Sequence, residues 1–127
     1  MAISPRPSAR SFKTHFFAKQ ARKAKISDGE LCRIVSEFAT GKATDLGGGV
    51  FKQRLHHNEY RSILIAKGRD YWVLEFLFAK KDAENITRAA LDGFRTLADR
   101  YAALNPRQLE LLIEAGDLEE ICHATDA

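Results

Sequence analysis

The stretch VFKQRLHHNEYRSILIAKGRDYWVLEFLFAKK, residues 50–81, decides the fold. Residues 50–55 and 60–67 alternate between apolar and polar side chains, which is the two-residue period of a strand. Residues 71–81 are more continuously apolar, which predicts a strand in the interior of a sheet. Because the connections HHNE and GRD are short, we expect an antiparallel meander of three strands.

The chain before this stretch predicts a short strand and two helices. RSFKT, residues 10–14, is typical of a strand, and HFFAKQARKAK, residues 15–25, is typical of a helix. Ser27 and Glu30 form an S-x-x-E capping box, in which each side chain satisfies an amide of the other's turn. The next residues have the spacing of one buried helix face before Gly41 ends the helix, and these are Leu31, Ile34, Val35 and Phe38. Two helices in succession predict an αα-hairpin.

The glycines of LGGG, residues 46–49, are interpreted as a flexible turn from helix to strand. A phosphate-binding loop needs a strand before the glycines and a helix after them, and here the expected order is the reverse. Helical periodicity returns over residues 85–104. A last helix is expected to follow, with a cap formed by Asn105, Pro106 and Gln108.

The composition is that of a soluble globular chain. The values of 45% hydrophobic and 29% charged residues are ordinary for this class, and no apolar run reaches the roughly 18–20 residues that cross a bilayer. We expect residues 1–9 to be a flexible basic arm and residues 10–127 to form one α+β domain. The N-terminus lacks the apolar core of a secretory signal, so a cytoplasmic protein is expected. Cys32 and Cys122 share no metal-ligand spacing, which predicts two unpaired, reduced thiols.

The charge of the chain is unevenly distributed. Residues 1–25 carry seven Lys or Arg and no acid, whereas residues 82–127 carry ten acids and four arginines. The net charge of +3 therefore conceals a basic front and an acidic tail. This distribution favours a polyanionic ligand on one face, although uneven surfaces also occur in proteins without such a ligand.

Four basic side chains are expected on one side of the sheet. Lys52 and Arg54 lie two residues apart on a strand and therefore project from the same face. Arg61 begins the neighbouring strand after the short HHNE connection, and Lys80 ends the third strand in phase with Phe76. Solvated lysines and arginines are also common on strand edges, so the pattern by itself leaves both interpretations open.

Such a cluster has the chemistry to cleave RNA without a metal. The 2′-hydroxyl beside each phosphate is an internal nucleophile, so cleavage needs a base, a cation for the phosphorane and an acid for the leaving oxygen. Arginine can bind two phosphate oxygens with its planar fork. Nearby cations lower the pKa of a lysine toward the range of acid–base catalysis. His56 and His57 are alternative proton carriers in the connecting loop, although loop histidines are commonly incidental.

Four segments in this order resemble the RelE and HigB toxins of bacterial toxin–antitoxin systems. They are FAKQARKAKISDGEL, DLGGGVFKQR, YRSI and FAKKDAENI, and the resemblance extends from about Ser11 to Ile121. It implies a RelE-like α+β fold, with an N-terminal helical hairpin packed on a small, mostly antiparallel sheet and with C-terminal helices. It also implies a toxin that cleaves mRNA, usually on the ribosome, with no metal and no other cofactor.

The resemblance places the catalytic positions of the family at Lys52, Arg54, Arg61 and Lys80. Further RNA-binding positions are expected nearby, at Lys81, His56, His57, Phe76 and Asn85. Capping of the following helix explains Asn85 equally well. Two features depart from the family, namely the shortened HHNE loop and a phenylalanine at position 76, where relatives often carry an aromatic hydroxyl. Phe76 keeps the capacity for base stacking but not for hydroxyl chemistry.

The resemblance also implies partners. A cognate antitoxin would cover the basic face, mRNA and the ribosome would be the targets, and operator DNA would be bound only through the toxin–antitoxin complex. No membrane partner is expected. Two alternatives keep the same fold. One is a ParE-like toxin that poisons DNA gyrase without catalysis, and the other is an inactive relic that acts as an antitoxin-binding regulatory partner.

Overall fold

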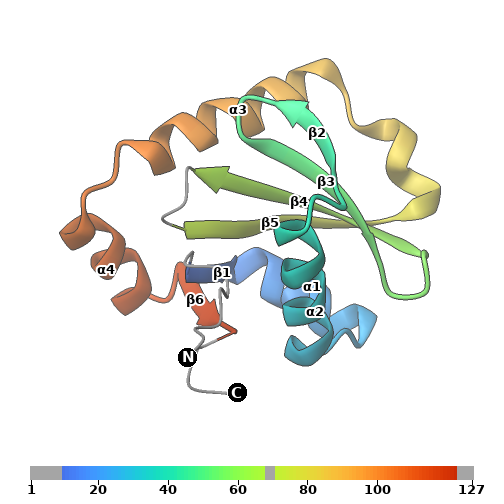
Figure 1. The fold of residues 1–127 in the computed structure, drawn as a ribbon, viewed down its shortest axis with the longest axis horizontal. Coiled ribbons are helices and arrows are strands. Elements are labelled where there is room, and N and C mark those ends of the chain that lie inside the picture. The colour runs from blue at the N-terminus through green and yellow to red at the C-terminus, as the bar shows by residue number, and fades with distance from the viewer. Residues whose placement is uncertain (1–9, 68–70, 123–127) are drawn as a thin grey trace.

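The computed structural model describes residues 10–67 and 71–122, which form an open six-stranded sheet with helices on both faces (Figure 1). The elements in chain order are β1 (Arg10–Thr14), α1 (His15–Ala24), α2 (Asp28–Ala39), β2 (Thr44–Gly47), β3 (Val50–Leu55), β4 (Tyr60–Lys67), β5 (Tyr71–Ala79), the 3₁₀ helix η1 (Lys80–Asn85), α3 (Arg88–Ala102), α4 (Pro106–Glu114) and β6 (Leu118–Ile121). The α+β class is confirmed. No helix among the described residues is long and apolar enough to cross a membrane.

The strands lie in the order β2-β3-β4-β5-β1-β6, and every neighbouring pair is antiparallel except β1 with β5. The predicted meander of β3, β4 and β5 is confirmed, and β1 and β6 extend the sheet on the β5 side. The expected bounds of β3 and β4 agree with the structure. The third strand ends two residues earlier than expected, because the chain turns into η1 at Lys80.

Each face of the sheet has its own helices and its own apolar core. The two consecutive helices expected before the meander, α1 and α2, cover one face, where Phe17 and Leu64 are fully buried. α3 and α4 cover the opposite face, where Phe12 and Ile63 are fully buried. We call this second face the α3 face, and it carries the candidate site.

A β-bulge in β5 determines which of its side chains reach the α3 face. Leu74 and Phe76 pair with consecutive residues of β4, so Glu75 between them is an extra residue in β5. The extra residue shifts the alternation of the strand, and Phe76 and Phe78 therefore share the α3 face with Val73. Without the bulge, both phenylalanines would point toward α1 and α2.

The glycines of LGGG form a hairpin turn between β2 and β3, so the expected turn from helix to strand is wrong. β2 pairs with β3 as a short edge strand, which its sequence does not predict. Gly49 has a φ of +87°, and a Cβ at this position would lie 2.9 Å from the backbone oxygen of Ala66, so glycine is required there. Arg95 of α3 closes the turn by donating hydrogen bonds to the carbonyl oxygens of Leu46 and Gly47.

The two predicted capping boxes have different outcomes. Ser27 accepts a hydrogen bond from the backbone N–H of Glu30 at 3.2 Å, as a capping box requires. The Glu30 carboxylate instead lies 3.0 Å from Nδ1 of His56 in the loop between β3 and β4. Asn105 and Gln108 form a complete capping box at the start of α4. The first prediction is therefore half correct, because a tertiary partner takes the carboxylate.

Cys32 and Cys122 form a disulfide, so the expectation of two unpaired thiols is wrong. Their Cα atoms lie 5.4 Å apart, although the two residues are 90 positions apart in the sequence. The cause is β6, a strand that was not predicted, which pairs with β1 and is followed directly by Cys122. β1 is in turn tied to α2, since Lys13 pairs with Asp28 at 2.7 Å. Sequence spacing gives no sign of this approach, because it depends on tertiary pairing.

Removal of the disulfide is expected to destabilise the oxidised protein. A disulfide typically contributes about 2–4 kcal/mol, in the chain-entropy account by restricting the unfolded chain. The Cys32→Ser, Cys122→Ser double variant should have a free energy of unfolding in urea that is lower by about this amount. A reductant should lower the stability of the parent protein to that of the variant. Equal stability of the oxidised parent and the variant would contradict the cross-link.

Candidate functional site

Three of the four expected catalytic side chains lie in adjacent rows on the α3 face. Arg54 of β3 pairs directly with Arg61 of β4, and Arg61 pairs with Phe78 of β5. The next row consists of Lys52, Ile63 and Phe76. Because paired residues of antiparallel strands project to the same side, these side chains share one face. We call Lys52, Arg54 and Arg61 the cation cluster.

The cation cluster has no acidic partner among the side chains that the structure describes. Among the side chains that the structure describes, every ion pair involves other cations than these three. Arg54 is exposed and Arg61 is half-buried. Like charges directly opposite each other in a sheet are unfavourable, by on the order of a few tenths of a kcal/mol. An anion that bridges the two guanidinium groups would relieve this repulsion, and a phosphate can do so with two oxygens.

The shortened HHNE connection holds Arg61 in place. His56, His57 and Asn58 have φ angles of 53°, 58° and 67°, a left-handed run that is unusual outside glycine and stores strain. Nη1 of Arg61 donates hydrogen bonds to the carbonyl oxygens of Asn58 at 3.1 Å and Tyr60 at 3.0 Å. One nitrogen of the guanidinium is therefore anchored to the turn. Nε and Nη2 donate to no other group in the described part of the chain, and they remain available to an anion.

The two histidines of the connection have different environments. His56 is half-buried, and its Nδ1 lies 3.0 Å from a carboxylate oxygen of Glu30, so it joins the turn to α2. His57 is exposed and lines a shallow cavity together with Arg33, Glu37 and Arg54. His57 is therefore the histidine with access to a ligand.

Lys80 lies at the same end of the sheet but not in a strand. The expectation that it ends the third strand is wrong, because it is the first residue of η1. Its backbone N–H donates to the carbonyl oxygen of Glu59 at 2.8 Å, one step beyond the last pair of β4 and β5. Lys80 and Lys81 are both exposed, and they line a cavity beside this end of β4.

Asn85 is the last residue of η1, and its side chain lies outside the part of the molecule that the structure describes. The cap of α3 is Thr87, whose side chain accepts a hydrogen bond from the backbone N–H of Ala90. The interpretation of Asn85 as the cap of this helix is therefore wrong. Its role in RNA binding stays a prediction.

Aromatic side chains continue from the cation cluster toward α1. The rings of Phe78 and Phe76 stack with centroids 5.9 Å apart. Phe16, from the first turn of α1, stacks on Phe76 with the same centroid distance and an interplanar angle of 16°. Phe16 is 53% exposed. We call Phe16, Phe76 and Phe78 the aromatic row.

Phe16 was not among the residues expected from the sequence. The buried residues of α1 are Phe17, Ala18 and Ala21, and Phe16 lies outside this stripe. A phenylalanine among the exposed and mostly basic residues of an amphipathic helix was the available signal.

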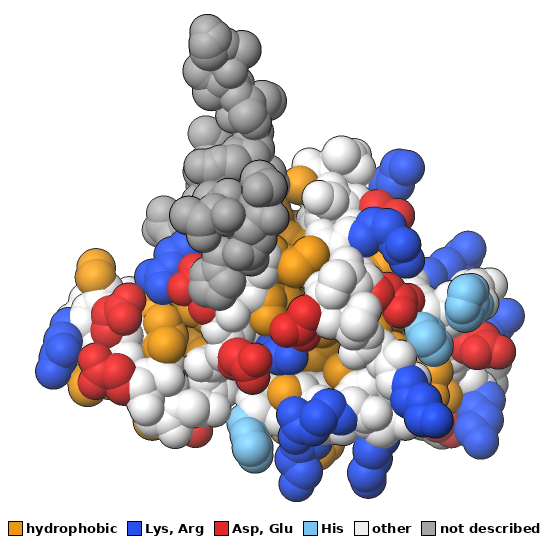
Figure 2. Space-filling view, turned by 90° about the horizontal axis from the view of Figure 1, so that it is seen from below, with side chains coloured by type: hydrophobic (Ala, Val, Ile, Leu, Met, Phe, Trp, Pro, Cys, Tyr) orange, Lys and Arg blue, Asp and Glu red, His pale blue; other side chains and the backbone are white. Residues whose placement is uncertain are grey.

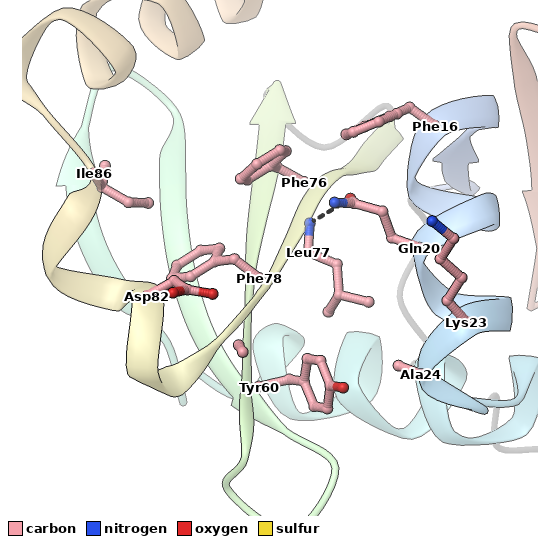
Figure 3. A pocket seen from close by; sticks show the side chains of 11 residues that line it. Phe16, Gln20, Lys23, Ala24, Tyr60, Phe76, Leu77, Phe78, Asp82 and Ile86 are labelled. Atoms are coloured by element: carbon pink, nitrogen blue, oxygen red, sulfur yellow. Dashed lines mark hydrogen bonds between the residues drawn. The ribbon is translucent and has the colours of Figure 1, made fainter.

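The aromatic row lines a groove of about 600 Å³ along the outer edge of β5 (Figure 3). β1 pairs with β5 only as far as Leu74, and α1 lies beside the strand beyond that point. Oε1 of Gln20 accepts a hydrogen bond from the backbone N–H of Leu77 at 3.1 Å, and the Thr14 hydroxyl donates to the carbonyl oxygen of Glu75 at 3.5 Å. Side chains at the start of α1 and within it thus occupy part of the open strand edge.

The basic side chains are unevenly distributed over the surface. In the view of Figure 2, Lys and Arg side chains are most numerous toward the right-hand end and along the lower edge, where His side chains also lie, whereas Asp and Glu side chains occur across the whole face. In the described residues, no group of three or more His, Cys, Asp or Glu side chains is placed to hold a metal ion.

A family model described as the RelE toxin of the RelE / RelB toxin–antitoxin system matches residues 9–121. The chain belongs to the RelE toxin family. This RelE-family protein is accordingly the toxin of a toxin–antitoxin module, and its partner is a cognate antitoxin. The match includes every element that carries the cation cluster and the aromatic row. Comparison with curated proteins and with solved structures gives no match.

The bulge residue Glu75 is a polar group beneath α3 in this RelE-family toxin. Its Oε1 accepts a hydrogen bond from the Tyr101 hydroxyl at 2.8 Å. Burial raises the pKa of Glu75, and the hydrogen bond from Tyr101 offsets part of this shift. Burial also raises the pKa of Tyr101, and the nearby Glu75 carboxylate adds to that shift. Ionisation of Glu75 is therefore less favourable in the folded protein than in the unfolded chain.

Replacement of Glu75 by glutamine is expected to change the pH dependence of stability. A carboxyl whose folded pKa is raised binds its proton more tightly when folded, so the parent protein loses stability as the pH rises above the usual value of 4.5. The Glu75→Gln amide cannot ionise, and its oxygen can still accept the hydrogen bond from Tyr101.

Urea unfolding at about pH 4 and about pH 7.5 should show the variant gaining stability relative to the parent at the higher pH. The exposed Glu114 of α4 provides the control, since Glu114→Gln should show no such change. A stability difference between parent and Glu75→Gln that is constant with pH would contradict the assigned direction.

Proposed function

We propose that this RelE-family toxin is an endoribonuclease that cleaves mRNA on the ribosome and leaves a 2′,3′-cyclic phosphate and a 5′-hydroxyl. The observation that carries the proposal is the direct pairing of Arg54 with Arg61 without a described acidic partner. Two arginines that face each other on a sheet form an anion site at a cost in stability. The scissile phosphate of RNA supplies the missing negative charge.

The nucleophile in this reaction is the 2′-hydroxyl of the RNA itself. Lys52, as the neutral amine, takes the hydroxyl proton while the 2′-oxygen bonds to phosphorus. The bond from phosphorus to the 5′-oxygen breaks, and Lys80 gives a proton to that departing oxygen. The two lysines are interchangeable in these roles, and the exposed His57 is an alternative proton carrier beside Arg54.

Arg54 and Arg61 stabilise the negative charge that the phosphorane gains relative to the bound substrate. Strand pairing fixes their backbones, and the bonds from Arg61 to the turn carbonyls hold one guanidinium before the substrate arrives. Groups that are already oriented need little reorganisation in the transition state. Lys81 beside the acid contacts a neighbouring phosphate, and Phe76 belongs to the aromatic row that stacks a base.

The partners follow from this role. mRNA and ribosomes are the targets, so we place the protein in the cytoplasm. The antitoxin silences the toxin by covering the basic end of the sheet. Operator DNA is bound by the toxin–antitoxin complex through the antitoxin.

The test is induction of the toxin in bacterial cells, followed within minutes by mapping of mRNA 5′ ends. The parent protein should produce new ends in phase with codons. On purified ribosomes, Arg61→Ala and Arg54→Gln should each lower the rate of cleavage by about 100-fold, because each removes one cation from the phosphorane. Arg107 on α4 is exposed and outside the cluster, so Arg107→Ala should cleave at the parent rate.

Intact transcripts accompanied by an SOS response would instead point to gyrase poisoning. Absence of any effect on growth would point to an inactive regulatory partner. If codon-phased cleavage persisted in Arg61→Ala and Arg54→Gln, the nuclease activity would be supported but the cation cluster would not be its site. Thermal unfolding of each variant would show that a lost activity does not reflect a lost fold.

A further inference from the structure

Phe16 exposes a large apolar surface next to the candidate site. Among the described residues, the large apolar side chains that are exposed are Phe16, at 53%, and Leu111 on α4, at 47%. Phe16 is not isolated, because its ring already stacks on Phe76 at the mouth of the groove. A flat ligand that covers the Phe16 ring would remove apolar area from water and gain stacking energy.

The aromatic row is continuous with the cation cluster. Arg61 pairs with Phe78 across the strands, Phe78 stacks on Phe76, and Phe76 stacks on Phe16. A single strand of RNA has the same alternation of charged and flat groups, with a phosphate beside every base. Proteins bind such strands by holding phosphates with cations and stacking bases on aromatic rings.

The edge of β5 is less suited to a peptide strand. Strand addition needs free backbone N–H and C=O groups along the edge. Gln20 already occupies the N–H of Leu77, and Thr14 occupies the carbonyl of Glu75. The groove therefore presents aromatic ring faces to a ligand rather than a row of free backbone N–H and C=O groups.

The charged side chains of the groove distinguish a base from a phosphate. Asp82 of η1 and Lys23 of α1 both line it (Figure 3). A carboxylate repels a phosphate, but it accepts hydrogen bonds from the amino groups of bases. Because Lys23 offsets the charge of Asp82, the lining of the groove has no net charge. It thus suits an uncharged base, whereas phosphates suit the cation cluster at the other end of the row.

We propose that the groove between α1 and η1 binds one base of the single-stranded mRNA next to the cleaved phosphate, with that base stacked on Phe16. The proposal rests on the proposed function for the identity of its ligand. Phe16 is then a substrate-binding residue that touches the RNA but not the reacting atoms. Its loss should weaken binding of mRNA without changing the rate of the chemical step.

The experiment uses bacterial ribosomes programmed with an mRNA whose vacant A-site codon is 2′-O-methylated, so that the nucleophile is blocked. The equilibrium Kd of the toxin for this complex is measured for the parent and for three variants. Phe16→Ala should bind about tenfold more weakly, whereas Phe16→Tyr should retain the parent affinity because it keeps the ring. Leu111→Ala removes the other exposed apolar side chain and should bind like the parent.

A series of templates with an abasic nucleotide at each codon position in turn identifies the base. When the abasic nucleotide stands at the position that Phe16 contacts, the parent should bind about tenfold more weakly than it binds the intact template. Phe16→Ala should bind that abasic template and the intact template with the same affinity. On an unmodified codon at saturating toxin, the single-turnover cleavage rate of Phe16→Ala should equal that of the parent.

If Phe16→Ala bound every template as tightly as the parent does, the proposed base site in the groove would be wrong and the proposed nuclease activity would be unaffected. Failure of the parent protein to bind programmed ribosomes would refute both proposals together. If Phe16→Ala weakened binding of the purified antitoxin but not of the programmed ribosome, the groove would be an antitoxin site and the proposal would be wrong.

Discussion

The direct opposition of Arg54 and Arg61 across β3 and β4 is the constraint on which the rest of the site depends. A slip of one residue in this pairing would turn both the apolar and the basic side chains of β3 to the wrong faces. The register is held from the other side of the sheet, where Gln53 donates a hydrogen bond to the carbonyl oxygen of Ile34 at 2.8 Å and Leu55 is buried. Packing under α2 thus maintains a repulsive pair that has no described acidic partner. An unfavourable interaction that the rest of the fold compensates is typical of a functional site.

The second half of the site follows from the bulge at Glu75 and from the place of α1. The bulge turns Phe76 and Phe78 to the face that carries the arginines, and α1 brings Phe16 to the same row. The Glu75 side chain is satisfied by Tyr101 of α3. One extra residue in β5 therefore links the cation cluster to the aromatic row and to the helix above them.

The meander, both helix pairs and the three clustered cations could be predicted because each depends on local periodicity. Alternation over residues 50–55 determines the faces of Lys52 and Arg54 whatever the partner strand is. The features that sequence reasoning missed depend on distant contacts. β6 and the disulfide of Cys32 with Cys122 need the tail to return to β1, and the pairing of Glu30 with His56 competes with a local cap. The turn into η1 at Lys80 likewise ends the strand before residue 81, where the sequence pattern places its end.

The most direct test of the account is a structure of this RelE-family toxin on a ribosome whose A-site codon is 2′-O-methylated. The account predicts that oxygens of one mRNA phosphate lie about 3 Å from the guanidinium groups of both Arg54 and Arg61. It also predicts a base in the groove beside Phe16. A phosphate backbone that runs over another surface, with Arg54 and Arg61 still facing each other without an anion between them, would contradict the account.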